Sequence, residues 1–165
     1  MTARTDNVGS ARPTRTQIDQ FLSHRRFAAV GVSRNPKDFT RVVVGEFEQC
    51  GYEVVPVNPG ASEINGQPCF ARVQDVNPPV SAVLLLTPPA MTEQVVQDCH
   101  AAGVTHVWMY RGGGVGAVSN AAVAYCDERG IEVIAGECPL MFLPNPGFPH
   151  RVHGLIRKVL RTYPL

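Results

Sequence analysis

Five short runs of apolar residues recur along the chain and predict five β-strands. They are rich in Val, Ile, Leu and Ala and lack a strict alternation of polar and apolar positions, which is typical of strands covered on both faces of a parallel sheet. The runs span residues 27–32, 54–57, 80–86, 106–110 and 131–135.

Segments with helical periodicity separate these runs. Apolar side chains recur every three or four residues in the segments 40–50, 92–102 and 119–129, the last of which begins at Ser119, a favourable N-cap. A shorter helix, capped by Thr16, is predicted ahead of the first strand. The three longer helices are each followed by a glycine, the residue that most easily ends a helix in the left-handed conformation. These glycines are Gly51, Gly103 and Gly130.

Strands that begin about 25 residues apart, with helices between them, predict right-handed βαβ crossovers. The expected fold class is therefore α/β, a three-layer, Rossmann-like, doubly wound fold with a five-stranded, mainly parallel sheet. We expect residues 1–15 to form a flexible tail and residues 16–143 to form the domain. Residues 144–165 are predicted to be a proline-rich connector and a C-terminal helix, at about 149–161, packed on the domain.

Composition excludes several classes of function. The 165 residues suit one domain, and the net charge of +1, from 15 basic and 14 acidic residues, gives no general attraction to nucleic acid or to an anionic membrane. The longest uncharged run, residues 76–92, holds four prolines and is shorter than the roughly 20 residues of a membrane span. Five cysteines without a C-x-x-C motif, and no signal-peptide pattern at the start, predict free thiols in the cytoplasm.

The loop after the first predicted strand has the features of an anion site. Ligands of open parallel sheets bind beyond the carboxyl ends of the strands, and this loop leads into a helix N-terminus, which favours phosphate. Glycine allows close backbone approach, hydroxyls can hydrogen-bond and three side chains are cationic, although an ordinary basic loop is the alternative interpretation. The candidate ligand-binding residues are Gly31, Val32, Ser33, Arg34, Lys37, Thr40 and Arg41. Arg25 and Arg26 precede the strand and are expected at the opposite edge.

The loop after the second strand argues against a nicotinamide dinucleotide. Dinucleotide folds usually place Asp or Glu there for the ribose 2′-hydroxyl, whereas this chain has Asn58-Pro59, and Glu63 comes too late. An NADP site would favour an arginine at this place, and no arginine follows the second strand here.

Several sequence blocks resemble the small stand-alone CoA-binding proteins, which are similar to the N-terminal domain of succinyl-CoA synthetase α subunits and of ADP-forming acyl-CoA synthetases. The resemblance covers roughly residues 21–143, and its most specific block is GYEVVPVNP at 51–59. The other blocks are AVGVSRNP at 29–36, INGQPCF at 64–70, Trp108, and Cys138-Pro139.

This resemblance implies a Rossmann-like fold that holds coenzyme A along the strand ends. It implies that the 31–34 loop and Asn58-Pro59 cradle the nucleotide, and that residues after the third and fourth strands line the remainder of the ligand. The latter are Thr87, Pro88, Met109, Tyr110, Arg111 and Gly112. Cys138 follows the fifth strand, so its thiol is expected to face the ligand or, alternatively, to be a small buried group.

The function expected from the sequence is binding of CoA or acyl-CoA without catalysis. Synthetases of the resembling families need a phosphohistidine domain and an ATP-grasp domain, and a single-domain chain has room for neither. The alternatives are an NAD(P)-dependent oxidoreductase-type protein and a CoA-sensing module that docks on an acyl-transfer enzyme; a homo-oligomer is left open. No metal site is expected, because His150 and His153 lack an evident third ligand.

Overall fold

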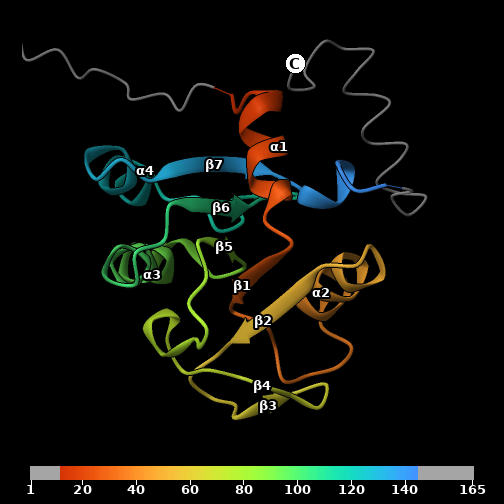
Figure 1. The fold of residues 1–165 in the computed structure, drawn as a ribbon. Helices are drawn as coiled ribbons and strands as arrows, with labels where there is room; N and C mark the ends of the chain where they lie inside the picture. The colour runs from red at the N-terminus through yellow and green to blue at the C-terminus, as the bar shows by residue number, and fades with distance from the viewer. Residues whose placement is uncertain (1–11, 145–165) are drawn as a thin grey trace, which may run out of the picture.

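The computed structural model describes residues 12–144, which form one five-stranded sheet with helices on both faces (Figure 1). The sheet is entirely parallel, with the strand order β2-β1-β5-β6-β7. Its strands are β1 (Arg26–Val30), β2 (Glu53–Val57), β5 (Ala82–Leu85), β6 (His106–Tyr110) and β7 (Glu132–Glu137). The predicted fold class is confirmed.

Within the described residues, four α-helices cover the sheet and give the three layers. α3 and α4 lie together on one face, whereas α1 and α2 pack on the other (Figure 1). Successive residues of β1 alternate between two apolar cores, because neighbouring side chains of a strand point to opposite faces: Phe27 and Ala29 belong to one core, Ala28 and Val30 to the other. The helices are α1 (Arg15–Ser23), α2 (Phe39–Gln49), α3 (Pro89–Ala101) and α4 (Asn120–Glu128).

The strand order creates a switch point between β1 and β5. The chain leaves β1 through α2 towards β2 on one side, and later returns to place β5 on the other side of β1. The loops that follow these two neighbouring strands therefore run to opposite faces and part from one another. Such a point is where open α/β sheets have room for a ligand.

Two helix starts differ from the prediction for local reasons. α1 is capped by Thr14 rather than Thr16, because the Thr14 hydroxyl accepts from Gln17 N while the Gln17 side chain accepts from Thr14 N, a reciprocal capping box. α3 begins at Pro89 rather than residue 92, since proline at the first helical position loses no hydrogen bond. The predicted Ser119 cap of α4 is confirmed, as are the left-handed glycines Gly51, Gly103 and Gly130.

A small antiparallel hairpin after β2 was not predicted. β3 (Glu63–Ile64) and β4 (Gln67–Pro68) flank Asn65-Gly66, whose positive φ angles of 55° and 75° suit the tight turn for which this dipeptide is favoured. The hairpin joins the sheet edge through a bridge between Val57 and Phe70. Two short 3₁₀ turns, Val73–Asp75 and Pro139–Met141, complete the described elements.

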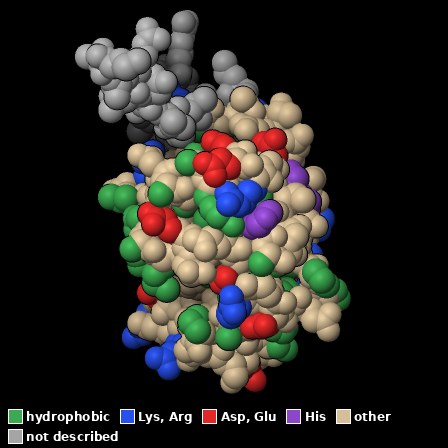
Figure 2. Space-filling view, turned by 90° about the vertical axis from the view of Figure 1, so that its left-hand side faces the viewer, with side chains coloured by type: hydrophobic (Ala, Val, Ile, Leu, Met, Phe, Trp, Pro, Cys, Tyr) green, Lys and Arg blue, Asp and Glu red, His purple; other side chains and the backbone are tan. Residues whose placement is uncertain are grey.

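Most of the predicted tail, the predicted C-terminal helix and its connector beyond Pro144, and the His150 and His153 pair all lie outside the described residues. Between residues 12 and 144, no helix has the length and apolar character that crossing a bilayer would require. Figure 2 shows the face that carries α3 and α4, where acidic, basic and hydrophobic side chains are interspersed.

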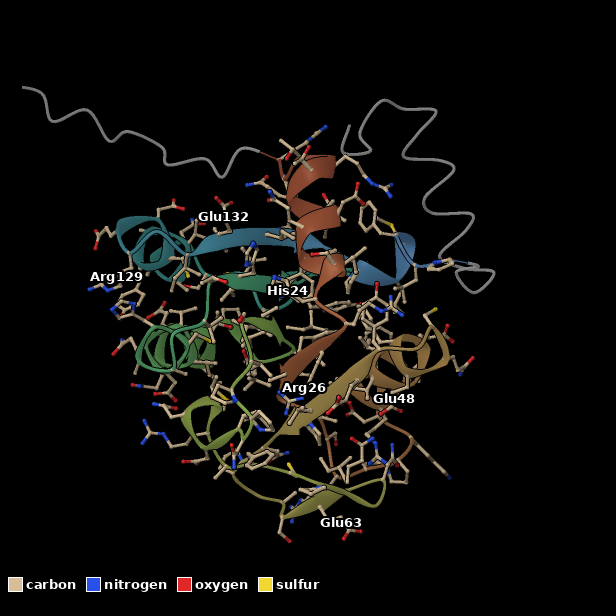
Figure 3. The ribbon with its side chains drawn as sticks, in the orientation of Figure 1. His24, Arg26, Glu48, Glu63, Arg129 and Glu132 are labelled. Atoms are coloured by element: carbon tan, nitrogen blue, oxygen red, sulfur yellow. The ribbon has the colours of Figure 1, made fainter. Side chains whose placement is uncertain are left out.

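The junction between α1 and β1 carries a histidine that should make the fold sensitive to acid (Figure 3). Burial lowers the pKa of His24 from 6.5, with a smaller contribution from His106, whose ring centroid lies 4.7 Å away. The unfolded chain then binds a proton at pH values where the folded chain does not, so stability should fall as the pH drops through 6.5 and level off below the lowered folded-state pKa.

We expect His24→Gln to reduce this loss of stability, measured as the free energy of unfolding in urea at about pH 7.5 and about pH 5. His100→Gln, at an exposed position on α3, is the control and should keep the wild-type dependence. An unchanged pH dependence in the His24 variant would contradict the prediction.

Candidate functional site

A pocket of about 250 Å³ opens at the carboxyl edge of the sheet, at the switch point. It is lined by the first turn of α2, by the loop after β5, and by the end of β6 with the loop that follows, as expected from the strand order. Four predicted residues meet there, namely Thr40, Thr87, Pro88 and Tyr110. Phe39, Leu86, Gly116 and Ala117 complete the lining and were not predicted.

The loop between β1 and α2 is held by bonds between its own side chains and backbone. The Ser33 hydroxyl accepts from Asn35 N at 3.1 Å, and the Asn35 side chain accepts from Lys37 N at 3.0 Å. Thr40 Oγ1 accepts from Ser33 N at 2.9 Å. These short-range bonds define the turn without using the cationic groups of Arg34 and Lys37, whose side chains are exposed.

The N-terminus of α2 departs from the expected anion site. Asp38 caps the helix, and its carboxylate accepts from Thr40 N at 2.8 Å and from Thr40 Oγ1 at 2.7 Å. These hydrogen bonds hold the pKa of Asp38 below its usual value. The chain's own carboxylate thus occupies the position at which the sequence suggested a phosphate, so an anion at this loop has to be bound mainly by side chains.

The Arg41 side chain links the β1–α2 loop to the β3–β4 hairpin. Its Nη1 donates to the carbonyl oxygens of Ser33 and Arg34 at 3.2 and 3.3 Å, and its Nη2 donates to the Asn65 side chain. Arg41 Nε is buried and has no hydrogen-bond partner among the described residues. Arg41 therefore fixes the loop and adds a stationary positive charge to it.

Asn58, at the end of β2, also has a structural task. Its Nδ2 donates to Val32 O at 2.8 Å, and its Oδ1 accepts from Gly60 N at 2.8 Å, which joins the ends of β1 and β2. Arg34 lies across this turn, since a β-carbon placed on Gly60 would be 3.9 Å from Arg34 Nε. Pro59 and Gly60 are exposed beside it. The structure thus brings the 31–34 loop and the Asn58-Pro59 turn together, but the Asn58 amide is already engaged.

Tyr110 and Cys138 form a polar pair at the far side of the pocket. The Tyr110 hydroxyl and the Cys138 thiol are hydrogen-bonded, and burial raises the pKa of both groups. The Tyr110 ring lies 5.5 Å from the Phe39 ring, and its hydroxyl passes close to Gly112. Cys138 is only 5% exposed, so the structure places it in its alternative role, as a buried thiol.

Three other predicted residues lie away from the pocket. Met109 and Val32 are fully buried, one in each apolar core, so their side chains cannot touch a ligand at this edge. Arg111 turns towards the end of β7, where its Nε donates to Gly136 O at 3.4 Å. Arg25 and Arg26 lie at the opposite edge as expected. Arg26, the first residue of β1, pairs with Glu53 at 2.9 Å (Figure 3). The guanidinium of Arg25, just before β1, stacks on the Tyr52 ring.

The pocket-lining residues that were not predicted differ in whether the sequence carries a signal that could have identified them. Leu86 ends the third apolar run, and the strand-end rule could have identified it. Phe39 begins a helix, where a large exposed apolar side chain is unusual, but Ala117 carries no local signal. Among residues 12–144, no group of three potential metal ligands lies together.

Comparison with known proteins finds one matching family and several similar proteins. A family model for the CoA binding domain matches residues 25–144. The uncharacterized protein YneT of Bacillus subtilis (strain 168) is 24% identical over 127 residues, which is 76% of this chain and 91% of YneT. The structure of a hypothetical protein from Pyrococcus horikoshii OT3 superposes with a TM-score of 0.71 at 25% identity, covering 87% of this chain and 93% of that one.

A larger enzyme also contains a similar segment. The acetate–CoA ligase [ADP-forming] II subunit alpha of Pyrococcus furiosus is 26% identical over 91 residues, which is 54% of this chain. The matched segment is 20% of that subunit.

Gly31 is expected to be indispensable for the switch point. Its φ is +92°, and a β-carbon there would lie 3.1 Å from the backbone carbonyl of Leu86. Gly31→Ala should therefore lower the free energy of unfolding by about 1–3 kcal/mol, measured by urea denaturation.

Gly45→Ala is the matched control, because this helical glycine has open space around it. It should raise stability by about 0.5–1 kcal/mol. A Gly31→Ala protein as stable as the wild type would show that the close approach to Leu86 is not needed.

Proposed function

Because this chain belongs to the CoA binding domain family, we propose that it binds coenzyme A along the carboxyl edge of its sheet. The phosphates would lie over the β1–α2 loop and the turn after β2. The pantetheine arm would extend from there across the mouth of the pocket towards β6. This path follows the order of the strands, so a single extended ligand can contact the ends of β2, β1, β5 and β6 in turn.

The observation that carries the proposal is a group of cations without acidic partners beside the pocket. Within residues 12–144, Arg15, Arg26, Arg72 and Arg129 each pair with a carboxylate. Arg34, Lys37 and Arg41 make no ion pair there, and unlike the other unpaired cations, Arg12, Arg25 and Arg111, they lie within eight residues of one another. Asp38 lies in the same loop and offsets one of the three positive charges, but its carboxylate bonds Thr40 and makes no ion pair with the cations. Charge-assisted bonds from Arg34 and Lys37 to phosphate oxygens would use this free charge.

Arg41 supports the same assignment in a different way. Its guanidinium is partly withdrawn from solvent and bonded to two carbonyls and one amide, so no anion within the described residues neutralises it. A partly buried charge is costly unless a counter-charge lies near. A phosphate above the loop would supply that counter-charge, which fits the nucleotide end of CoA.

An NAD(P) site is less well supported. The turn after β2 offers no carboxylate for a ribose diol, and the only amide there, Asn58, is engaged by Val32 and Gly60. In a thermal-shift measurement, CoA should raise the melting temperature and NAD or NADP should not.

We also propose that the chain does not ligate CoA by itself. The Cys138 thiol is buried and hydrogen-bonded to the Tyr110 hydroxyl, and burial raises the pKa of both groups, which disfavours a thiolate nucleophile or a phenolate base at this edge. Incubation with ATP, CoA and a carboxylic acid should therefore yield no acyl-CoA. Whether CoA controls docking to an acyl-transfer enzyme stays a prediction, which a pull-down with and without CoA would test.

Arg34→Ala should weaken CoA binding about 10- to 150-fold, since a charge-assisted contact contributes roughly 1.5–3 kcal/mol. Titration calorimetry at fixed low salt measures the change. Dephospho-CoA should bind the wild type more weakly than CoA, and added salt should weaken binding of CoA because exposed charges are screened.

Arg129→Ala serves as the control, because Arg129 lies at the end of α4, at the opposite edge of the sheet (Figure 3). It should leave CoA affinity unchanged. If Arg34→Ala bound CoA like the wild type, the phosphates would have to lie elsewhere.

A further inference from the structure

The pocket at the switch point has an unusual polar inventory. Its lining includes three hydroxyl groups, yet each is already bonded within the protein. Thr40 Oγ1 bonds Asp38 and Ser33 N, Thr87 Oγ1 bonds Thr92 Oγ1 at 2.8 Å, and the Tyr110 hydroxyl bonds Cys138. The backbone nitrogens of Leu86 and Ala117 are likewise engaged, by Val30 O and Tyr110 O. The pocket wall therefore offers hydrophobic contact and few free hydrogen-bonding groups.

The surroundings of the pocket are apolar as well. Among residues 12–144, four large hydrophobic side chains are strongly exposed, between 45% and 64%. Each lies within three residues of a residue that lines the pocket, on the first turns of α2 and α3 or in the β6–α4 loop. These residues are Phe39, Val42, Met91 and Val115. Phe39 itself lines the pocket, and the other three belong to the segments that supply its remaining lining residues, so its rim is rich in exposed hydrophobic side chains of the kind that mark binding surfaces.

An apolar pocket of this kind favours the hydrocarbon chain of a CoA thioester over its pantetheine arm. The pantetheine arm carries amides, which lose hydrogen bonds to water when they enter a pocket that offers no free partners. A hydrocarbon chain loses none and gains contact area. The volume of about 250 Å³ is below the roughly 300–1,000 Å³ of pockets for whole drug-sized ligands, so it suits one short segment of a ligand.

We propose that this pocket holds the acyl chain of a short-chain acyl-CoA, and that the thioester rather than free CoA is the preferred ligand. The proposal rests on the CoA binding proposed above. The phosphates would be held by the cations of the β1–α2 loop, and the pantetheine amides would remain at the solvated mouth. The acyl chain would then enter between Phe39, Tyr110 and Ala117.

The test is a series of affinities measured by titration calorimetry for CoA, acetyl-CoA, butyryl-CoA and hexanoyl-CoA. Each added methylene should tighten binding about fourfold until the pocket is full. If CoA binds and the acyl-CoAs bind no more tightly, the acyl site is wrong while the CoA site stands. If no member of the series binds, both proposals are wrong.

Two variants locate the effect. Ala117→Leu fills the pocket, so the ratio of hexanoyl-CoA to CoA affinity should fall to near one. Because overpacking can disturb folding, Phe39→Ala gives a second measure: Phe39 is 45% exposed, and its loss should reduce the same ratio while removing its contact with the Tyr110 ring. Tyr125→Ala, a partly exposed aromatic of α4, is the matched control and should keep the wild-type ratio. A wild-type ratio in both pocket variants would overturn the proposal.

Discussion

The arrangement of the whole edge depends on how closely β1 approaches β5. At the end of β1 the backbone passes against the carbonyl of Leu86 with no side chain between them, and immediately afterwards the two chains separate to opposite faces of the sheet. If a side chain at position 31 pushed β1 and β5 apart, their parallel pairing would be broken. If both strands were followed by helices on the same face, the helices would fill the space between the two loops. The pocket is thus a consequence of strand order combined with one residue that has no β-carbon.

The carboxyl edge of the sheet carries two kinds of surface, one after the other from β2 to β6. Towards β2 it is cationic, because Arg34, Lys37 and Arg41 outnumber Asp38, whose carboxylate caps the helix and forms no ion pair with them. Towards β6 it is apolar, because the hydroxyls that line it are paired with one another or with buried groups. A ligand with phosphates at one end and a hydrocarbon at the other matches both surfaces only in one orientation, which gives direction as well as affinity.

The sequence predicted the fold well because its signals are local and consistent. Apolar runs, helical periodicity and the three glycines after the helices each depend on residues within one element. The site was less predictable, since a side chain's task depends on partners far along the chain. Asn58 and Arg41 have the residue types of ligand-binding groups, yet Val32 O and Asn65, respectively, engage them. Met109 lies at the same strand end as Tyr110, but its side chain is buried in the core. Thr14 rather than Thr16 caps α1 because the Gln17 side chain accepts a hydrogen bond from Thr14 N in return.

The small hairpin has a further consequence for the dynamics of this edge. Strands of two residues bury too little to be stable alone, so β3 and β4 keep their place through the Val57–Phe70 bridge and through the Arg41–Asn65 bond. Since the same guanidinium holds the carbonyls of Ser33 and Arg34, the hairpin and the β1–α2 loop form one cooperative unit for local opening. Whatever binds the loop therefore slows amide hydrogen exchange in a hairpin that it need not touch.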